Sequence, residues 1–148
     1  YNHRYLMEQL QREVQRASRH NTAFSIIMLD IDHFKDYNDK FGHLDGNKVI
    51  KGVAKLLLKI ARTTDTVGRF GGEEFCIIVP EIKKVGALIF AKRILQEVKK
   101  NSLPNRTITL SGGVAMFPKD GKTPMELIKK ADIRLYKAKK HGRDQVCC

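Results

Sequence analysis

The sequence lacks the patterns that mark membrane-spanning and secreted proteins, zinc proteins and several common enzyme classes. No apolar stretch is long enough to cross a bilayer, and no signal peptide is visible. Cysteine is scarce, and Cys76, Cys147 and Cys148 show no Cys-x-x-Cys or Cys/His spacing for zinc. A Walker A loop, a Gly-x-Ser-x-Gly turn and a catalytic Cys/His arrangement are also missing, which argues against a P-loop NTPase and a hydrolase. We therefore expect a soluble domain in a reducing cytoplasm.

Acidic residues are few relative to basic ones. The chain has 28 Lys and Arg against 16 Asp and Glu, a formal net charge of +12. Such a balance attracts polyanions, so DNA binding is one hypothesis. No aromatic RNA-binding signature or zinc finger accompanies the charge, and many of the lysines are typical of solvated helix faces. Because a triphosphate substrate also explains part of the excess, we expect nucleotide binding, with no nucleic-acid or membrane contact by this domain.

The chain does contain the alternation of apolar patterns expected of one α/β domain. Its 148 residues can bury a core, and 42% of them are hydrophobic. Apolar periodicity and turn residues predict an opening helix with Leu6, Leu10, Val14 and Ala17 on its buried face, a strand at 24–32, a helix at 45–61, a hairpin of strands 66–70 and 75–79, a helix at 85–100, a strand at 106–117, a last helix and a short strand at 145–146. Thr123, Pro124 and Glu126 should start the last helix through a capping box, and Gly142 should end it. Strands alternating with helices, together with one hairpin, predict an α/β sandwich with an antiparallel-containing sheet.

The segment 69–75, Arg-Phe-Gly-Gly-Glu-Glu-Phe, is the most informative feature of the chain. Its two glycines allow a tight turn that residues with a Cβ would resist, and two carboxylates follow at once. A second acidic pair, Asp30 and Asp32, ends another apolar run. A single acid of this kind usually caps a strand end and pairs with a lysine. The combined pattern favours a divalent-cation site for nucleotidyl transfer.

The segment Gly71-Gly72-Glu73-Glu74-Phe75 resembles the signature of GGDEF domains, the diguanylate cyclases, in its Glu-for-Asp form. Further motifs of that family match in order over essentially the whole chain: Asp30 to Lys35, Asn38 to His43, Arg62 to Asp65, and Ala131 to Arg143. The resemblance implies an α/β (α+β) palm-like nucleotidyl cyclase fold, with a central mixed or antiparallel sheet flanked by helices and the signature on a β-hairpin. It also implies that residues 1–148 form a single catalytic domain whose entry segment is truncated and whose upstream sensory region is absent from the sequence.

The resemblance assigns the metal role to Asp30 and Glu73, assisted by the backbone carbonyl of Ile31 and by Glu74. Mg²⁺, or Mn²⁺ in its place, takes hard oxygen ligands. Two such ions in each site would lower the pKa of an attacking 3′-hydroxyl and neutralise the leaving pyrophosphate. The catalytic residues implied in this way are Glu73, Glu74, Lys139 and Arg143.

The substrate-binding positions of the family fall on Phe34, Lys35, Asn38, Asn47, Lys139 and Arg143. Lys35, Lys139 and Arg143 should hold the triphosphate, and Asn38 should contact guanine. Asn47 departs from the family, which has Asp at this position. A carboxylate accepts from both N1–H and N2–H of guanine, whereas a carboxamide offers one acceptor, so we expect a weakened guanine preference. The alternative is that Asn47 accepts a single bond and specificity survives.

Arg62 and Asp65 stand in an Arg-x-x-Asp pattern at the family's spacing before the two glycines. The resemblance implies an inhibitory site there, which binds the product cyclic di-GMP away from the active centre. Arg93 matches a further arginine that contacts the product from a neighbouring domain. The alternative interpretation of Arg62 and Asp65 is a surface ion pair of little energy.

The function implied by the resemblance is that of a diguanylate cyclase, which condenses two GTP into cyclic di-GMP and two pyrophosphates. One domain offers one half-site, so catalysis should require a homodimer, at least a transient one. A catalytically weak receptor that binds cyclic di-GMP through Arg62, Asp65 and Arg93 is the alternative, and the intact acids count against it. A membrane anchor upstream of the domain is compatible with either function.

Overall fold

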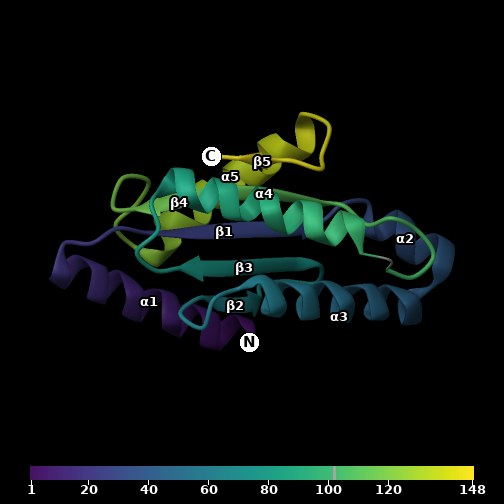
Figure 1. Cartoon of the computed structure of the whole chain (residues 1–148), viewed down its shortest axis with the longest axis horizontal. Helices are drawn as coiled ribbons and strands as arrows, with labels where there is room; N and C mark the ends of the chain where they lie inside the picture. Colours follow the sequence, from purple (N-terminus) through teal and green to yellow (C-terminus); the bar gives the residue numbers. More distant parts are fainter. Residues whose placement is uncertain (102) are drawn as a thin grey trace.

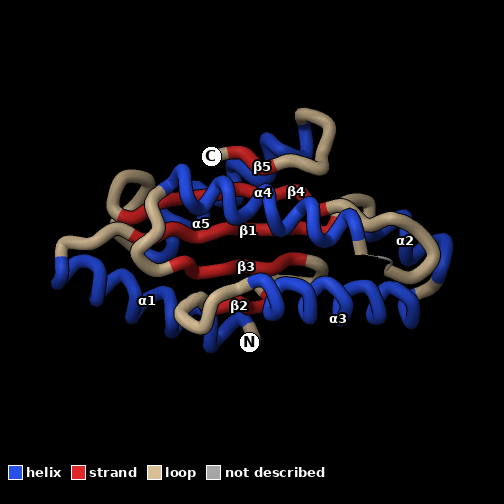
Figure 2. Tube along the Cα trace, in the orientation of Figure 1, coloured by secondary structure: helices blue, strands red, loops and turns tan. Residues whose placement is uncertain are grey.

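The computed structural model describes residues 1–101 and 103–148, and it shows helices on both faces of one sheet (Figure 1). In chain order the elements are α1 (His3–His20), β1 (Phe24–Ile31), α2 (Phe34–Phe41), α3 (His43–Ile60), β2 (Thr66–Arg69), β3 (Glu74–Val79), α4 (Lys84–Lys100), β4 (Leu110–Phe117), α5 (Pro124–Lys140) and β5 (Val146–Cys147). The strands, drawn in red in Figure 2, form a five-stranded sheet in the order β2-β3-β1-β4-β5. Neighbouring strands are antiparallel except for β4 and β5, which are parallel. This mixed sheet confirms the predicted fold class. Within the described residues, none of the helices is both long enough and apolar enough to span a membrane.

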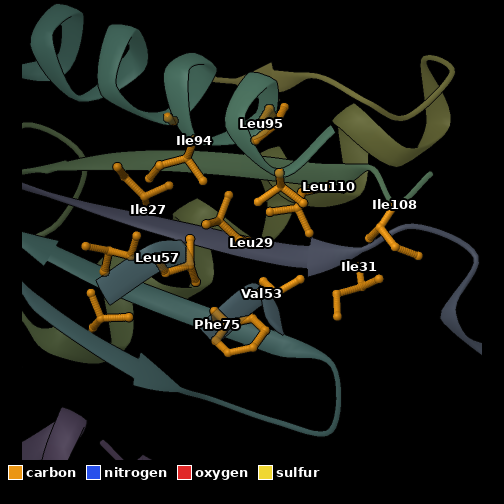
Figure 3. Packing of buried hydrophobic residues seen from close by; sticks show 14 of the residues in the cluster. Ile27, Leu29, Ile31, Val53, Leu57, Phe75, Ile94, Leu95, Ile108 and Leu110 are labelled. Carbon is orange, nitrogen blue, oxygen red and sulfur yellow. The ribbon is translucent and has the colours of Figure 1, made fainter. Parts of the chain in front are cut away.

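Strand β1 lies in the middle of the sheet, and all eight of its residues are buried. Ile27, Leu29 and Ile31 point to one face, where they pack with residues of α3 and α4 (Figure 3). Ile26 and Met28 point to the other face and pack with α1 and α5. Since side chains alternate along a strand, the residues after Met28 continue this assignment, and Asp30 belongs to the face covered by α5.

Helix α2 is the element that the sequence-based expectations do not include. It has only eight residues, and Phe34 and Tyr37 are its buried side chains. Two turns provide too short an apolar stripe to distinguish a helix from a loop by periodicity. The predicted helix at 45–61 also begins earlier, at His43, because Gly42 separates α2 from α3 with a positive φ of 82°.

The predicted strand at 106–117 is too long at its start. Strand β4 begins at Leu110, which pairs with Ile31, the last residue of β1. Residues 106–109 lie beyond this pair, where β1 has already ended and offers no strand partner. The last strand is also displaced by one residue, to Val146–Cys147.

Both ends of α5 have the capping residues predicted from the sequence, but one of the capping hydrogen bonds is made one residue earlier than expected. The Thr123 hydroxyl accepts from the backbone N–H of Glu126 at 3.3 Å, and Pro124 is the first helical residue. The Glu126 carboxylate accepts from the N–H of Lys122 at 2.7 Å, so the second bond of the predicted capping box is made one residue earlier. Gly142 follows the helix with a positive φ of 104°, as expected for a glycine at a helix end.

Cys76 lies in β3 and is fully buried. Burial raises the pKa of its thiol to about 12, so the group stays protonated at neutral pH. The prediction that Cys76 is a small buried apolar residue is confirmed.

Candidate active site

The acids of the two motifs meet at one end of the central strands. Asp30, the residue before Ile31 at the end of β1, pairs directly with Glu74, the first residue of β3. The N–H of Ile31 donates to the carbonyl oxygen of Glu73 at 3.4 Å. Because antiparallel neighbours run in opposite directions, the end of one strand lies beside the start of the other. The prediction that Asp30 and the signature acids lie side by side is therefore confirmed.

Arg69 and Gly71 shape the turn that precedes β3. Arg69 Nε donates to the carbonyl oxygens of Gly71 and Gly72 at 3.1 and 3.0 Å, and its Nη2 donates to that of Gly72 at 2.6 Å. A Cβ on Gly71 would collide with the Glu74 carboxylate. The residue at 71 must therefore be glycine for Glu74 to keep its place.

Gly72 has a different role from the one expected of it. Neither Gly71 nor Gly72 is among the residues with positive φ, and a Cβ on Gly72 would meet no heavy atom within 4 Å. The expectation that both glycines are needed to make the turn is wrong for Gly72. Its missing side chain leaves open space at the tip of the turn, next to Glu73.

Asp30 is buried and lies among other acids. Its side chain is 7% exposed, and Lys139 of α5 places its Nζ 2.7 Å from Oδ2. Burial raises the pKa of Asp30, Lys139 lowers it, and Glu73 and Asp32 raise it further, with a net upward shift. The pKa of Glu74 is also raised, first by burial and then by Asp30. The site therefore holds more negative charge than Lys139 balances.

The donors at this site suit a cation that keeps part of its own water shell. Asp30 and Glu73 offer carboxylate oxygens, and Ile31 lies at the same strand end with its backbone carbonyl. In residues 1–101 and 103–148, no group of three or more Asp, Glu, His or Cys side chains could hold a metal by itself. Mg²⁺ is usually bound by one or two carboxylates together with waters and phosphate oxygens, and Mn²⁺ has similar preferences. Asp30, Ile31 and Glu73 fit such an ion when a nucleotide completes its shell.

Helix α2 begins directly beyond this site. Its N-cap residue, His33, has a positive φ of 56° and makes no side-chain cap. The N–H groups of an uncapped first turn, together with the helix dipole, favour a bound anion. Lys35 is exposed in that turn, whereas the Phe34 side chain is 7% exposed and packs in the core. A substrate-binding role for Phe34 therefore falls on its backbone N–H.

Helix α5 supplies the other two residues expected at the phosphates. Lys139 reaches the site through its ion pair with Asp30. Arg143 is exposed in the turn after α5, and the next residue, Asp144, donates its N–H to the Asp32 carboxylate at 3.1 Å. Lys139 and the backbone of residues 143–144 therefore lie at the end of β1.

The two residues expected to contact guanine lie on adjacent helices. Asn38 belongs to α2 and Asn47 to α3. Gly46 packs directly on Asn38, because a Cβ at Gly46 would collide with Asn38 Oδ1. In the described part of the chain Asn38 Oδ1 is buried without a hydrogen-bond partner, and Asn47 is exposed. Asn38 and Asn47 thus belong to helices that pack closely at Gly46.

The Arg-x-x-Asp segment forms a turn. The Asp65 carboxylate accepts from the backbone N–H of Arg62 at 2.8 Å, and the Asp65 N–H donates to the Arg62 carbonyl at 3.0 Å. Asp65 Oδ1 is buried and has no hydrogen-bond partner in the residues described. Asp65 thus contacts the backbone of Arg62, and no ion pair joins the two side chains in the described residues.

Arg62 and Arg93 line different hollows of the same domain. Arg62 is exposed and lines a hollow of about 500 Å³ together with Arg16 and Glu81. Arg93 lines a hollow of about 440 Å³ between α3 and α4, and its Nη2 donates to the Ile60 carbonyl at 3.5 Å.

A known family matches the sequence over nearly its whole length. The profile described as "Diguanylate cyclase, GGDEF domain" aligns with residues 1–145. The chain belongs to the GGDEF domain family. A curated relative, the probable diguanylate cyclase DgcC of Escherichia coli (strain K12), is 36% identical over 148 residues, which cover 98% of this chain and 40% of the relative. The GGDEF domain described here therefore spans about two fifths of that relative's length.

Solved structures of GGDEF domains share this fold over almost all residues. The active GGEEF domain of a diguanylate cyclase from Vibrio cholerae matches with a TM-score of 0.93 and 33% identity, covering 99% of this chain and 95% of that chain. The GGDEF domain of DgcB from Caulobacter crescentus, in complex with c-di-GMP, matches with a TM-score of 0.91 and 32% identity, covering 99% and 89%. The family and the fold predicted from the motifs are both confirmed.

Three residues of this GGDEF domain have roles at the site that were not assigned from the sequence. Arg69 holds the signature turn, and its position two residues before Gly71 was the available signal. Asp132 adds negative charge beside Glu74 and contributes to its raised pKa. Asp32 is buried and accepts hydrogen bonds from β4 and from Asp144, and only its period-two separation from Asp30 pointed to the same face.

Proposed function

We propose that this GGDEF domain is a diguanylate cyclase, which condenses two GTP into cyclic di-GMP and releases two pyrophosphates. The observation that carries the proposal is the pairing of Asp30 with the signature acids beside the uncapped N-terminus of α2. Carboxylates for a phosphate-bound cation thus lie next to backbone donors for phosphate oxygens. The diguanylate cyclases among its relatives support the same activity.

The acids at the strand end would hold the metal, and the basic residues would hold the substrate. Asp30, the Ile31 carbonyl and Glu73 would bind Mg²⁺ or Mn²⁺, with two ions in each site. When bound, these ions lower the pKa of the 3′-hydroxyl and neutralise charge on the leaving pyrophosphate. Lys35, Arg143 and the first N–H groups of α2 would bind triphosphate oxygens and orient the α-phosphate. Lys139 is within reach of the same phosphates because it already contacts Asp30.

The reaction requires two domains that face each other. In each half-reaction the 3′-oxygen of one GTP forms a bond to the α-phosphorus of the other, and the bond to pyrophosphate breaks. One domain has one set of base-binding and phosphate-binding residues, so we propose an antiparallel homodimer. Specific activity should then rise with protein concentration in the dilute range. A constant specific activity in protein shown to be monomeric contradicts the dimer.

Product inhibition would act through Arg62 and Asp65. The Arg62 guanidinium is exposed, whereas Asp65 Oδ1 is buried without a partner in the described residues, so the Asp65 side chain would have to turn outward to accept from a ligand. An arginine fork binds a phosphate or the O6/N7 edge of guanine, and a carboxylate accepts from N1–H and N2–H. Cyclic di-GMP bound here and to Arg93 of a second copy would hold two domains in a non-productive arrangement.

The decisive experiment is incubation of the domain with GTP and Mg²⁺, followed by identification of the nucleotide products by mass spectrometry. Cyclic di-GMP and pyrophosphate are expected in a ratio of one to two. Unchanged GTP together with tight binding of added cyclic di-GMP would instead support the receptor function. The intact pairing of Asp30 with the signature acids favours the first outcome.

A further inference from the structure

Asp32 is a buried carboxylate beside the active site to which the proposed chemistry gives no role. It follows β1 directly and is 4% exposed. Its oxygens accept from the Thr109 hydroxyl at 2.8 Å, the Ser111 hydroxyl at 2.7 Å and the backbone N–H of Asp144 at 3.1 Å. Burying a carboxylate is costly unless it is well hydrogen-bonded, and these donors meet that demand. Asp32 is therefore committed to protein contacts, unlike Asp30.

The bond from Asp144 reaches the turn that carries Arg143. Gly142, Arg143 and Asp144 are consecutive residues in the left-handed region, with φ of 104°, 62° and 47°. This conformation is strained for side chains other than glycine, so contacts outside the turn must hold it. The Arg143 N–H donates to the Ala138 carbonyl at 3.0 Å, which ties the turn to its own helix. The bond to Asp32 ties it to the sheet.

The direction of the Arg143 side chain depends on this backbone. The side chain is exposed, and within residues 1–101 and 103–148 its guanidinium makes no hydrogen bond or ion pair in the protein. Asp144 is held on its other side by an ion pair of 2.5 Å with Lys99 of α4. The turn is thus clamped between α4 and the end of β1, and the clamp decides which region the guanidinium can reach.

We propose that Asp32 is a positioning residue for Arg143. Its carboxylate fixes the turn at residues 142–144 to the end of β1, so that the arginine reaches the phosphate site next to Asp30. The inference rests on the proposed function, in which Arg143 binds the triphosphate. Asp32 itself touches neither metal nor substrate. It sets the separation between the strand end that carries the metal-binding groups and the turn that carries the arginine.

Amide hydrogen exchange tests the clamp without reference to activity. In the unliganded wild type the Asp144 amide should exchange slowly, although its turn lies at the surface. In Asp32→Asn, which retains one acceptor and the side-chain shape, its exchange should be at least about tenfold faster. Ser111→Ala removes a different donor to Asp32 and should leave the Asp144 amide protected. Free exchange of this amide in the wild type overturns the proposal, and this measurement stands even where Asp32→Asn does not fold.

Pyrophosphate binding in the presence of Mg²⁺, measured by calorimetry, tests the link to Arg143. Asp32→Asn should weaken binding about tenfold in the wild-type background and less than about twofold in an Arg143→Ala background, because both changes remove the same contact. Equal losses in the two backgrounds would show that Asp32 acts through general stability, and they overturn the proposal. Ser111→Ala should bind like the wild type. Absence of binding to the wild type overturns the proposed function and the phosphate role of Arg143, while the exchange result still decides whether Asp32 holds the turn.

Discussion

Two ion pairs of α5 contain an aspartate whose side chain is less than a tenth exposed, 8% for Asp120 and 7% for Asp30, and they differ in how many hydrogen bonds the carboxylate accepts. Asp120 receives two guanidinium N–H groups of Arg134 at 2.6 and 2.8 Å and the backbone N–H of Met116 at 3.0 Å. Asp30 receives one ammonium, that of Lys139, at 2.7 Å. The pKa of Asp120 is lowered, first by its hydrogen bonds from Arg134, whereas burial raises the pKa of Asp30.

The difference distinguishes Asp120, a carboxylate that stabilises the fold, from Asp30, a carboxylate whose charge is still available to bind a cation. Arg134 also donates to the Val114 carbonyl at 2.8 Å, so its pair with Asp120 fastens α5 to β4. Asp30 lies among Glu73 and other acids that a single lysine does not balance. Carboxylates with shifts of this kind concentrate at functional sites, because a group that must bind a ligand cannot be fully satisfied beforehand.

The largest expected effect is on turnover at the unsatisfied carboxylate. Asp30→Asn or Glu73→Gln should lower the rate of cyclic di-GMP formation by at least about 100-fold, since each removes charge that stabilises the metal-bound transition state. Folding should persist, because the raised pKa means that the ionised Asp30 side chain opposes folding in the unliganded protein. Initial rates and thermal melting measure both. Glu8→Gln, at an exposed acid of α1, is the control, and full activity of Asp30→Asn or activity in excess chelator would contradict the metal assignment.

The satisfied pair should show the opposite pattern, with lost stability and retained activity. Arg134→Ala leaves the Asp120 carboxylate buried without its partner, and the free energy of unfolding should fall by about 3–5 kcal/mol. Turnover per folded molecule should stay close to that of the wild type. Denaturant unfolding gives the stability, and Arg4→Ala, which removes an exposed ion pair with Glu8, should have little effect. A loss of turnover without a loss of stability would break the comparison.

The same pair predicts a pH dependence of stability. The folded-state pKa of Asp120 lies below its ordinary value of 3.8. Its stabilisation is therefore fully present above about pH 4 and is lost as the pH falls through the folded pKa. The stability difference between wild type and Asp120→Asn should narrow in this acidic range. A difference that stays constant down to about pH 2 would show that the carboxylate charge is not responsible.

An intermediate effect is expected at Arg62, whose side chain is exposed beside the turn that Asp65 closes. If the exposed Arg62 guanidinium binds cyclic di-GMP, Arg62→Ala should raise the concentration for half-maximal inhibition about tenfold, the usual loss for a charged hydrogen bond. The uninhibited rate should be unchanged, as should inhibition of Lys55→Ala, at an exposed lysine of α3. Rates measured against added cyclic di-GMP give the result. Competition with GTP, or undiminished inhibition in Arg62→Ala, would remove the inhibitory role.

The smallest effect is expected where a carboxylate is added. Asn47→Asp should raise the preference for GTP over ATP about three- to tenfold, because a carboxylate accepts from both N1–H and N2–H of guanine. Competition between the two nucleotides in wild type and variant measures the ratio. An unchanged ratio means that Asn47 does not contact the base.

The local sequence pattern was sufficient to predict most helices and strands and to mark the acids of the signature motif. The helical spacing of Leu6, Leu10 and Val14 predicted α1, since burial of one helix face requires that period. Helix α2 was not predicted, because its two turns are too short to show that helical spacing. At the active site the motif around Gly71 marked Glu73 and Glu74, but the reason why a glycine stands at 71 came from the Glu74 carboxylate packed against it.

The sequence by itself determined the family and the sheet-and-helix composition, and it named the acids and bases that are candidates for the site, because these depend on short spacings along the chain. The tertiary structure alone decided which hydrogen-bond donors and cations each carboxylate contacts. Asp30 meets Lys139 and Asp32 meets the Asp144 N–H, the latter across 112 residues, only because β1 and α5 end at the place where β4 begins. Hydrogen bonds form over about 3 Å, so their partners are set by the path of the folded chain and not by local spacing.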